Sequence, residues 1–185
     1  MEGNEDGGTI LPAKISDQLR PLFSPRSIAV VGASKTPGKW GNDMVARPIQ
    51  SSFRGSIYPI NPKGGEIEGL KAYPSVLDVD DPIDMAVITI PASLVPGAVK
   101  DCAKKGVKAI VLISAGFAET GPEGKALQDE VVSIARSAGI RFMGPSGMGI
   151  WTAGVRLNCA FDFTPQAGGI SFISQSGTMG GYLLA

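Results

Sequence analysis

A glycine-rich stretch, VVGASKTPGKWG at residues 30–41, directly follows the apolar run Ile28-Ala29-Val30. Glycine allows a backbone to approach a ligand closely. A strand followed by a glycine loop and a helix directs several N–H groups and the positive end of the helix at one anion. The stretch therefore predicts a phosphate-binding loop, and the open question is whose phosphate it holds.

The spacing of the glycines limits which nucleotide this loop could hold. Gly32, Gly38 and Gly41 do not match G-x-G-x-x-G, the dinucleotide fingerprint. They do not match G-x-x-x-x-G-K-[ST] either, because Gly38 lies one residue too far from Gly32 and Gly38-Lys39 is followed by Trp40. The spacing therefore disfavours both ATP bound in a P-loop and plain NAD.

A lysine stands where an NAD-binding domain would carry an acidic residue. The segment INPKGGEIEG follows the second apolar run and places Lys63 before two glycines. A cation there suits a ribose that carries a phosphate, either the 2′-phosphate of NADP or the 3′-phosphate of coenzyme A (CoA). Lys39 and Lys63 are both expected at the carboxyl ends of strands, where open α/β sheets bind ligands. NADP and CoA both stay open at this point.

Composition excludes several other classes of chemistry. The chain contains no histidine, which excludes a Ser-His-Asp triad, a histidine-ligated metal and a phosphohistidine within these residues. Cys102 and Cys159 form no metal-ligand spacing, and we expect no metal site. Two unpaired thiols are typical of a reducing, cytoplasmic setting.

Charge and hydropathy indicate neither a nucleic-acid partner nor a membrane. The 17 basic and 17 acidic residues cancel, so no global field attracts nucleic acid or an anionic membrane. The first residues lack the pattern of a signal peptide. No apolar run approaches the roughly 18 residues that a membrane span needs. We therefore expect a cytoplasmic protein.

Apolar runs that alternate with helical patterns must position these residues. The predicted elements are strands at 27–32, 56–62, 84–91, 108–114 and 140–145, helices at 42–52, 93–106 and 121–139, and a short irregular segment at 72–82. Strands and helices in this alternation predict a parallel sheet wound by βαβ units. The glycine loop, the Lys63 loop, Pro91 and the loop SAGFAETG at 114–121 then meet at one rim and form a groove.

The chain is expected to divide into four segments. Residues 1–13 are a polar, disordered tail, 14–147 a Rossmann-like doubly wound α/β domain, and 148–167 an extended connection. Residues 168–185 predict a new strand, a Ser-Gly turn and a helix start, which we interpret as the truncated start of a second domain. Alternatively, this last strand extends the first sheet.

Six motifs occur in the order SIAVVGASKTPGKWG, IYPINPKGGEIEGLKAYPSV, DMAVITIPA, AIVLISAGFAETGPEG, IRFMGPSGMGI and GGISFISQSGTMGG. Together they resemble the CoA-binding domain of the nucleoside-diphosphate-forming acyl-CoA synthetases. This superfamily includes ADP-forming acetyl-CoA synthetase and the α subunit of succinyl-CoA synthetase. The resemblance runs from about Leu22 to the last residue. It implies a Rossmann-like CoA-binding domain followed by the beginning of a flavodoxin-like ligase domain.

The resemblance also implies which residues bind the coenzyme. Those expected along its phosphates and its pantetheine arm are Gly32, Ala33, Ser34, Lys35, Lys39, Gly41, Lys63, Pro91, Ile113, Ser114 and Ala115. The family's corresponding lysine contacts CoA at the position of Lys63. A helix start at Ser176, Gly177 and Thr178 is expected to face the active-site phosphate. The plain alternative for Ser176 is an ordinary helix N-cap.

The implied reaction converts an acid, ATP and CoA to acyl-CoA, ADP and phosphate. The role of this chain would be to position the CoA thiol. The family's phosphohistidine and ATP-grasp portion are not among these 185 residues, so no catalytic residue is assigned and the chain alone is expected to be inactive. ATP, ADP and Mg²⁺ would bind through an ATP-grasp domain or β subunit of an oligomeric full enzyme.

One departure and two alternatives remain at this stage. The sequence has Gly144-Pro145-Ser146 where the family commonly has Gly-Pro-Asn, which puts the geometry of that loop in question. One alternative function is a non-catalytic CoA-binding or regulatory module, for example of a fused protein acetyltransferase. The other is an NADP-binding Rossmann domain.

Overall fold

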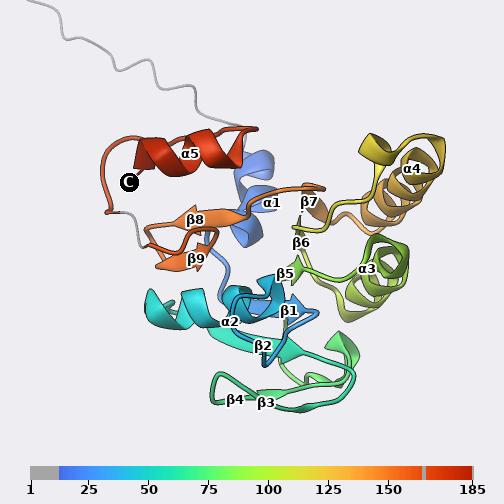
Figure 1. Cartoon of the computed structure of the whole chain (residues 1–185), viewed down its shortest axis with the longest axis horizontal. Helices are drawn as coiled ribbons and strands as arrows, with labels where there is room; N and C mark the ends of the chain where they lie inside the picture. Colours follow the sequence, from blue (N-terminus) through green and yellow to red (C-terminus); the bar gives the residue numbers. More distant parts are fainter. Residues whose placement is uncertain (1–12, 164–165, 185) are drawn as a thin grey trace, which may run out of the picture.

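The computed structural model describes residues 13–163 and 166–184, and it contains one five-stranded parallel sheet with helices on both faces (Figure 1). The strand order is β2-β1-β5-β6-β7, with β1 paired to both β2 and β5. In chain order the strands are β1 (Ser27–Val31), β2 (Ser56–Ile60), β5 (Met85–Ile88), β6 (Ala109–Leu112) and β7 (Arg141–Met143).

The remaining elements are helices and two short antiparallel hairpins. The helices are α1 (Ala13–Phe23), α2 (Trp40–Gln50), α3 (Val95–Lys105), α4 (Pro122–Ser137) and α5 (Gly177–Leu184), with single 3-10 turns at Val76–Asp78, Ala92–Leu94 and Ala118–Thr120. The hairpins are β3 (Gly65–Ile67) with β4 (Leu70–Ala72), and β8 (Ile150–Thr152) with β9 (Leu157–Cys159). None of the described helices is long and apolar enough to cross a membrane.

The strands are apolar at consecutive positions because both faces of the sheet are covered. In β1, Ile28 and Val30 belong to a core that includes α2 and the β8–β9 hairpin, while Ala29 and Val31 belong to a core that includes α3 and α4. Figure 1 shows α3 and α4 together on one side of the sheet and α1 and α2 on the other. Continuous apolar runs are what a doubly covered parallel strand requires.

This architecture confirms the predicted α/β, Rossmann-like fold class. All five predicted strands are found, each shorter at its carboxyl end than the sequence indicated. The predicted helices correspond to α2, α3 and α4, and the irregular segment contains the 3-10 turn Val76–Asp78. Sequence patterns gave no sign of α1 or of the β3–β4 hairpin. The predicted tail lies outside the described residues except for Ala13, which begins α1.

Two predictions for the last forty residues are wrong. The connection expected to be extended contains the β8–β9 hairpin, which is attached to α2 because Arg47 Nη1 donates to the carbonyl of Ala160 at 2.8 Å. The strand expected after residue 168 does not form within the described residues. Ile170 and Ile173 are 90% and 92% exposed, and no described strand lies beside them to accept and donate the hydrogen bonds that a strand needs.

Strand order determines where a ligand can bind. The chain leaves β1 for β2 on one side and later returns to place β5 on the other side of β1. At such a switch point the loops that follow the two central strands diverge and leave a crevice at their carboxyl ends. The glycine loop after β1 and the segment after β5 border this point.

Candidate functional site

The glycine loop after β1 packs too closely for side chains at two of its glycines. Gly32 has φ +93°, and a Cβ there would lie 2.6 Å from Ile90 Cγ2 and 2.9 Å from Thr89 Oγ1. A Cβ at Gly41 would overlap the carbonyl oxygen of Gly32. The first turn of α2 therefore rests directly on the start of the loop, and both glycines are required by the local packing.

Only part of this loop can donate backbone hydrogen bonds to an anion. The N–H groups of Gly32 and Ala33 both donate to the carbonyl of Ile60, at 3.1 and 3.0 Å. Within the described part of the chain, no partner is found for the N–H groups of Ser34 and Lys35. The donors open to a phosphate therefore begin at Ser34, after the buried Ala33.

The loops after β1 and β2 bring lysines together. Asn61 connects the two loops, since its Nδ2 donates to the Ala33 carbonyl at 2.8 Å and its Oδ1 accepts from the N–H of Lys63 at 2.9 Å. Lys35 Nζ lies 3.4 Å from the position that a Cβ on Gly65 would take, so Lys35 reaches across to the segment that follows Lys63.

None of the nearby lysines is neutralised by the described residues. Lys35, Lys39 and Lys63 are exposed, and no ion pair to them occurs within residues 13–163 and 166–184. Lys39 is the residue that precedes α2, in extended backbone. We call Ser34, Lys35, Lys39, Lys63 and Gly65 the lysine end of the rim.

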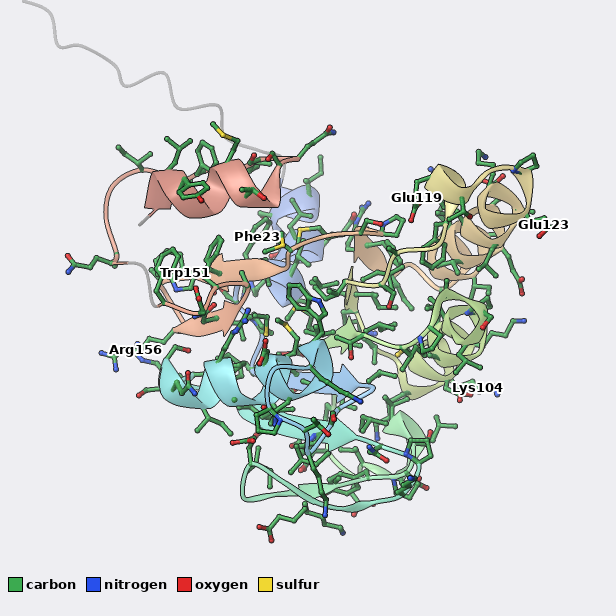
Figure 2. The ribbon with its side chains drawn as sticks, viewed as in Figure 1. Phe23, Lys104, Glu119, Glu123, Trp151 and Arg156 are labelled. Atoms are coloured by element: carbon green, nitrogen blue, oxygen red, sulfur yellow. The ribbon has the colours of Figure 1, made fainter. Side chains whose placement is uncertain are left out.

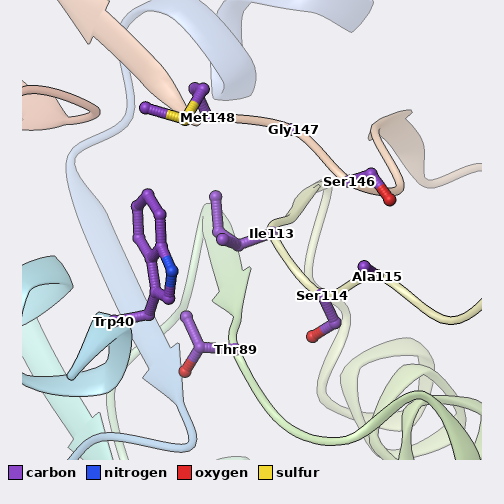
Figure 3. A pocket seen from close by; sticks show the side chains of 8 residues that line it. All are labelled: Trp40, Thr89, Ile113, Ser114, Ala115, Ser146, Gly147 and Met148. Atoms are coloured by element: carbon purple, nitrogen blue, oxygen red, sulfur yellow. The ribbon is translucent and has the colours of Figure 1, made fainter. Parts of the chain in front are cut away.

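A cavity of about 280 Å³ opens farther along the same rim (Figure 3). Its walls combine apolar groups with hydroxyls, and it is lined by Trp40, Thr89, Ile113, Ser114, Ala115, Ser146, Gly147 and Met148. No charged side chain is among them. We call these eight residues the cavity end. Its hydroxyls are already oriented, because Ser114 Oγ donates to the Ile90 carbonyl at 2.5 Å and Thr89 Oγ1 to the Val31 carbonyl at 3.1 Å.

The indole of Trp40 is held in place from behind. Arg47, about two turns further along α2, places its guanidinium carbon 5.8 Å from the ring centroid of Trp40. Arg47 is itself fixed by an ion pair to Asp43 at 2.8 Å and by the hydrogen bond to Ala160. The 41% exposed indole therefore keeps one face packed while it lines the cavity (Figure 3).

Glu119 connects the loops after β6 and β7. Its Oε1 accepts from the N–H of Gly116 at 2.6 Å and from Ser146 Oγ at 3.2 Å. Hydrogen bonds from the backbone N–H groups of Gly116, of Glu119 itself and of Phe117 lower the pKa of this exposed carboxyl to about 2. The N–H of Ser146 donates to the Ser114 carbonyl at 3.0 Å. In Figure 2, Glu119 lies beside the start of α4, far from Trp151 on the hairpin.

The start of α5 lies against the wall of the cavity. Ser176 is the helix N-cap, with its Oγ accepting from the N–H of Met179 at 3.2 Å. A Cβ at Gly177 would overlap the Met148 side chain, so Gly177 and the exposed Thr178 follow the cap directly beside a cavity residue. The N-cap role and an anion-facing role are compatible, because the remaining N–H groups of the first turn stay available.

The predicted site residues thus fall into two groups on one rim. Ser34, Lys35, Lys39 and Lys63 lie at its lysine end, Gly32, Ala33 and Gly41 support the loop beneath them, and Ile113, Ser114 and Ala115 line the cavity. Pro91 precedes the 3-10 turn Ala92–Leu94 and is not among the lining residues.

Sequence reasoning missed five of the eight cavity residues, namely Trp40, Thr89, Ser146, Gly147 and Met148. They come from the first residue of α2, the segment after β5 and the connection between β7 and β8, and the aromatic after Gly38-Lys39 was the only available signal for Trp40.

Metal and thiol chemistry find no support in the described chain. Among the described residues, no group of three or more His, Cys, Asp or Glu side chains could hold a metal ion. Cys102 and Cys159 are buried, and burial raises the pKa of each thiol to about 12. A thiol with so high a pKa is a poor nucleophile at neutral pH.

Comparison with known proteins gives consistent matches. A family model described as the CoA binding domain matches residues 26–153. The α subunit of ADP-forming acetate–CoA ligase I from Pyrococcus furiosus is 44% identical over 167 residues, which are 88% of this chain and 36% of that relative. The ADP-forming 4-hydroxybutyrate–CoA ligase of Nitrosopumilus maritimus is 38% identical and is covered over 23% of its length.

Solved structures agree with these matches. A dinucleotide-forming acetyl-coenzyme A synthetase of Ca. Korarchaeum cryptofilum, solved with phosphate and ADP, aligns with a TM-score of 0.84 at 45% identity. The alignment covers 90% of this chain and 36% of that one. The chain thus spans about a third or less of the length of these relatives.

Proposed function

Because the chain belongs to the CoA-binding domain family, we propose that it forms the CoA-binding part of an ADP-forming acyl-CoA synthetase. The reaction would convert an acid, ATP and CoA to acyl-CoA, ADP and phosphate. The proposal rests on one observation above all, the division of the rim into a lysine end and an uncharged cavity end. CoA has the same division, with charged phosphates at its nucleotide end and a neutral pantetheine arm.

The lysine end fits the phosphates of CoA. Lys35 and Lys63 lie on neighbouring loops and can place two ammonium groups near one nucleotide, while the N–H groups of Ser34 and Lys35 supply neutral donors. Hydrogen bonds from cations to phosphate oxygens are among the stronger kind. Gly32 and Gly41 keep the loop close to the strand ends, and the N–H of Gly32 is already bonded to Ile60.

The cavity end fits the arm and the thiol. Trp40 and Met148 would offer apolar surface to the methylene and gem-dimethyl groups, and the hydroxyls of Ser114 and Ser146 would serve its amides. The work of these residues is to hold the arm in one orientation and to exclude water from it. Fixing the thiol in this way converts an encounter between reactants into a reaction within one complex.

The start of α5 would bind the anionic reactant that the CoA thiol meets. Gly177 packs against the cavity residue Met148, and the first-turn N–H groups at Gly177 and Thr178 would favour an anion such as a phosphoryl group there. Nucleotide and Mg²⁺ would be held by an ATP-grasp domain or β subunit outside these residues. The complete enzyme would be an oligomer in the cytoplasm.

Calorimetric titration of the full chain with CoA and with NADPH tests the proposal. We expect saturable CoA binding and no NADPH binding, because the Lys63 loop serves a 3′-phosphate and the cavity accepts an arm rather than a nicotinamide. NADPH binding without CoA binding would overturn the proposal. CoA binding by the chain, with no ligase activity in the protein that carries it, would favour a regulatory module instead.

A further inference from the structure

A buried amide lies beneath the lysine end of the rim. Asn42, in the first turn of α2, is 4% exposed. Its Nδ2 donates to the Ser34 carbonyl at 3.0 Å and to Glu68 Oε1 at 2.7 Å. One nitrogen therefore joins the glycine loop to the turn of the β3–β4 hairpin, two segments that are 34 residues apart in the chain (Ser34 to Glu68).

Both of these segments lie next to the lysines. Ser34 precedes Lys35, whose Nζ extends to Gly65 at the start of β3. Glu68 sits in the hairpin turn with φ +51°, an unusual conformation for a residue other than glycine. This conformation belongs to the same turn that presents the Glu68 carboxylate to Asn42.

The arrangement fixes two successive carbonyls of the loop. Asn61 Nδ2 holds the Ala33 carbonyl and Asn42 Nδ2 holds the Ser34 carbonyl. With both carbonyls bonded to side chains of the protein, the adjoining N–H groups of Ser34 and Lys35 are left as the donors that a ligand can reach. The Ser34–Lys35 segment would therefore be held rigid before any ligand binds.

We propose that Asn42, anchored by Glu68, is a positioning residue for the nucleotide end of the ligand. It sets the separation between the Ser34–Lys35 segment and the Lys63–Gly65 segment, so that both lysines meet one nucleotide. The inference rests on the proposed function, because the ligand is taken to be CoA. We call the two hydrogen bonds from Asn42 to Ser34 and Glu68 the brace. Glu68 acts in the brace as a hydrogen-bond acceptor, and its negative charge is not needed.

The test compares Asn42→Ala, Glu68→Ala and Glu68→Gln by titration with CoA, with adenosine 3′,5′-bisphosphate and with pantetheine. Loss of the brace should weaken CoA and the bisphosphate about tenfold in Asn42→Ala and Glu68→Ala, since loop ordering is then added to the cost of binding. Pantetheine affinity should not change. Glu68→Gln retains the acceptor and should bind within about twofold of the wild type.

Asn158→Ala provides a matched control. Asn158 is also a buried asparagine, 3% exposed, and from β9 it donates to the Phe161 and Phe163 carbonyls, with no hydrogen bond to the lysine end among the described residues. Its loss should lower stability and leave bisphosphate affinity intact. If Asn158→Ala weakens the bisphosphate as much as Asn42→Ala does, or if all three ligands weaken together, the positioning role is wrong.

The outcomes separate the two proposals. If the wild-type protein binds no CoA, both the proposed function and the positioning role of Asn42 are wrong. If the wild-type protein binds CoA and the affinities of Glu68→Ala and Asn42→Ala are unchanged, only the positioning role of Asn42 is wrong. If Asn42→Ala fails to fold, the comparison of CoA affinity between Glu68→Ala and Glu68→Gln still tests the positioning role. Glu68 is exposed, so its substitution leaves the core intact.

Discussion

The lysine end and the cavity end of the rim are built from the same kind of connection, a loop at the carboxyl end of a parallel strand, yet they differ in charge. Lys35, Lys39 and Lys63 are exposed and without an ion-pair partner among the described residues. The eight residues of the cavity carry no charge at all. The chain as a whole is neutral, so this polarity comes from the placement of a few loops.

The difference indicates how such a fold acquires a long, two-part ligand. Burial fixes the strands from both faces and leaves little freedom in their sequence, whereas each loop at the rim can vary independently. One group of loops then supplies cations and N–H donors, and another supplies an apolar wall. Substitutions that affect one part of the ligand and spare the other are therefore the natural way to test the division.

Lys63→Ala should have the largest effect. Removing a cation from the 3′-phosphate is expected to weaken CoA about tenfold and dephospho-CoA much less. Titration of both ligands measures the difference. Lys104→Ala is the control, since Lys104 lies on α3 in an exposed pair with Asp101 and should leave both affinities unchanged. Equal losses for CoA and dephospho-CoA would contradict the assignment of Lys63 to the 3′-phosphate.

Trp40→Ala should have a smaller effect at the other end. Loss of the indole removes one apolar wall of the cavity and is expected to weaken CoA about threefold to tenfold. Affinity for adenosine 3′,5′-bisphosphate should stay at the wild-type value, the opposite of what Lys63→Ala produces. A parallel loss of bisphosphate binding would mean that Trp40 supports the glycine loop rather than the arm.

Glu119→Gln should have the smallest effect, and that effect should depend on pH. The Glu119 carboxyl has a folded-state pKa of about 2 against an ordinary 4.5, so its ionised form stabilises the folded protein above pH 4.5. This contribution is lost as the pH falls towards 2. Urea unfolding at pH 7, 5 and 3 should show a stability difference from wild type that shrinks with acidification.

The control for this substitution is Glu123→Gln, an exposed carboxylate in the first turn of α4 (Figure 2). Glu123 makes no hydrogen bond to the loops after β6 and β7 among the described residues, so a loss of stability that only Glu119→Gln shows is due to the Glu119 contacts. A difference between wild type and Glu119→Gln that is constant from pH 7 to pH 3 would mean that the Glu119 charge does not stabilise the loops after β6 and β7.

The fold was largely predictable because its strongest signals are local. The runs 28–31 and 109–113 are apolar without interruption and end at Gly32 and Ser114. The short hairpins were missed because strands of three residues carry too little pattern, and the β3–β4 turn depends on Glu68 adopting a positive φ. The strand expected after residue 168 has the right residues but no described neighbour to pair with.

The candidate site was predictable in its positions and less so in its details. Glycine spacing and position after strands indicated the glycine loop and Lys63, and the family resemblance indicated the segment 113–115; these segments follow the carboxyl ends of β1, β2 and β6. The expectation that backbone N–H groups serve the phosphates needs refinement, because those of Gly32 and Ala33 already donate to Ile60. Met148 could not have been found, since its position in the cavity depends on the β7–β8 connection.

By itself, the sequence determined a parallel sheet covered on both faces, a glycine loop after the first strand and a lysine after the second. These features follow from hydrophobic runs and from the conformational freedom of glycine, which are properties of neighbouring residues. Only the tertiary structure decided which N–H groups stay free, that Asn42 joins Ser34 to Glu68, and that Trp40 faces Met148 across one cavity. Each of these depends on how distant segments are placed by sheet register and helix packing, and no local pattern encodes that placement.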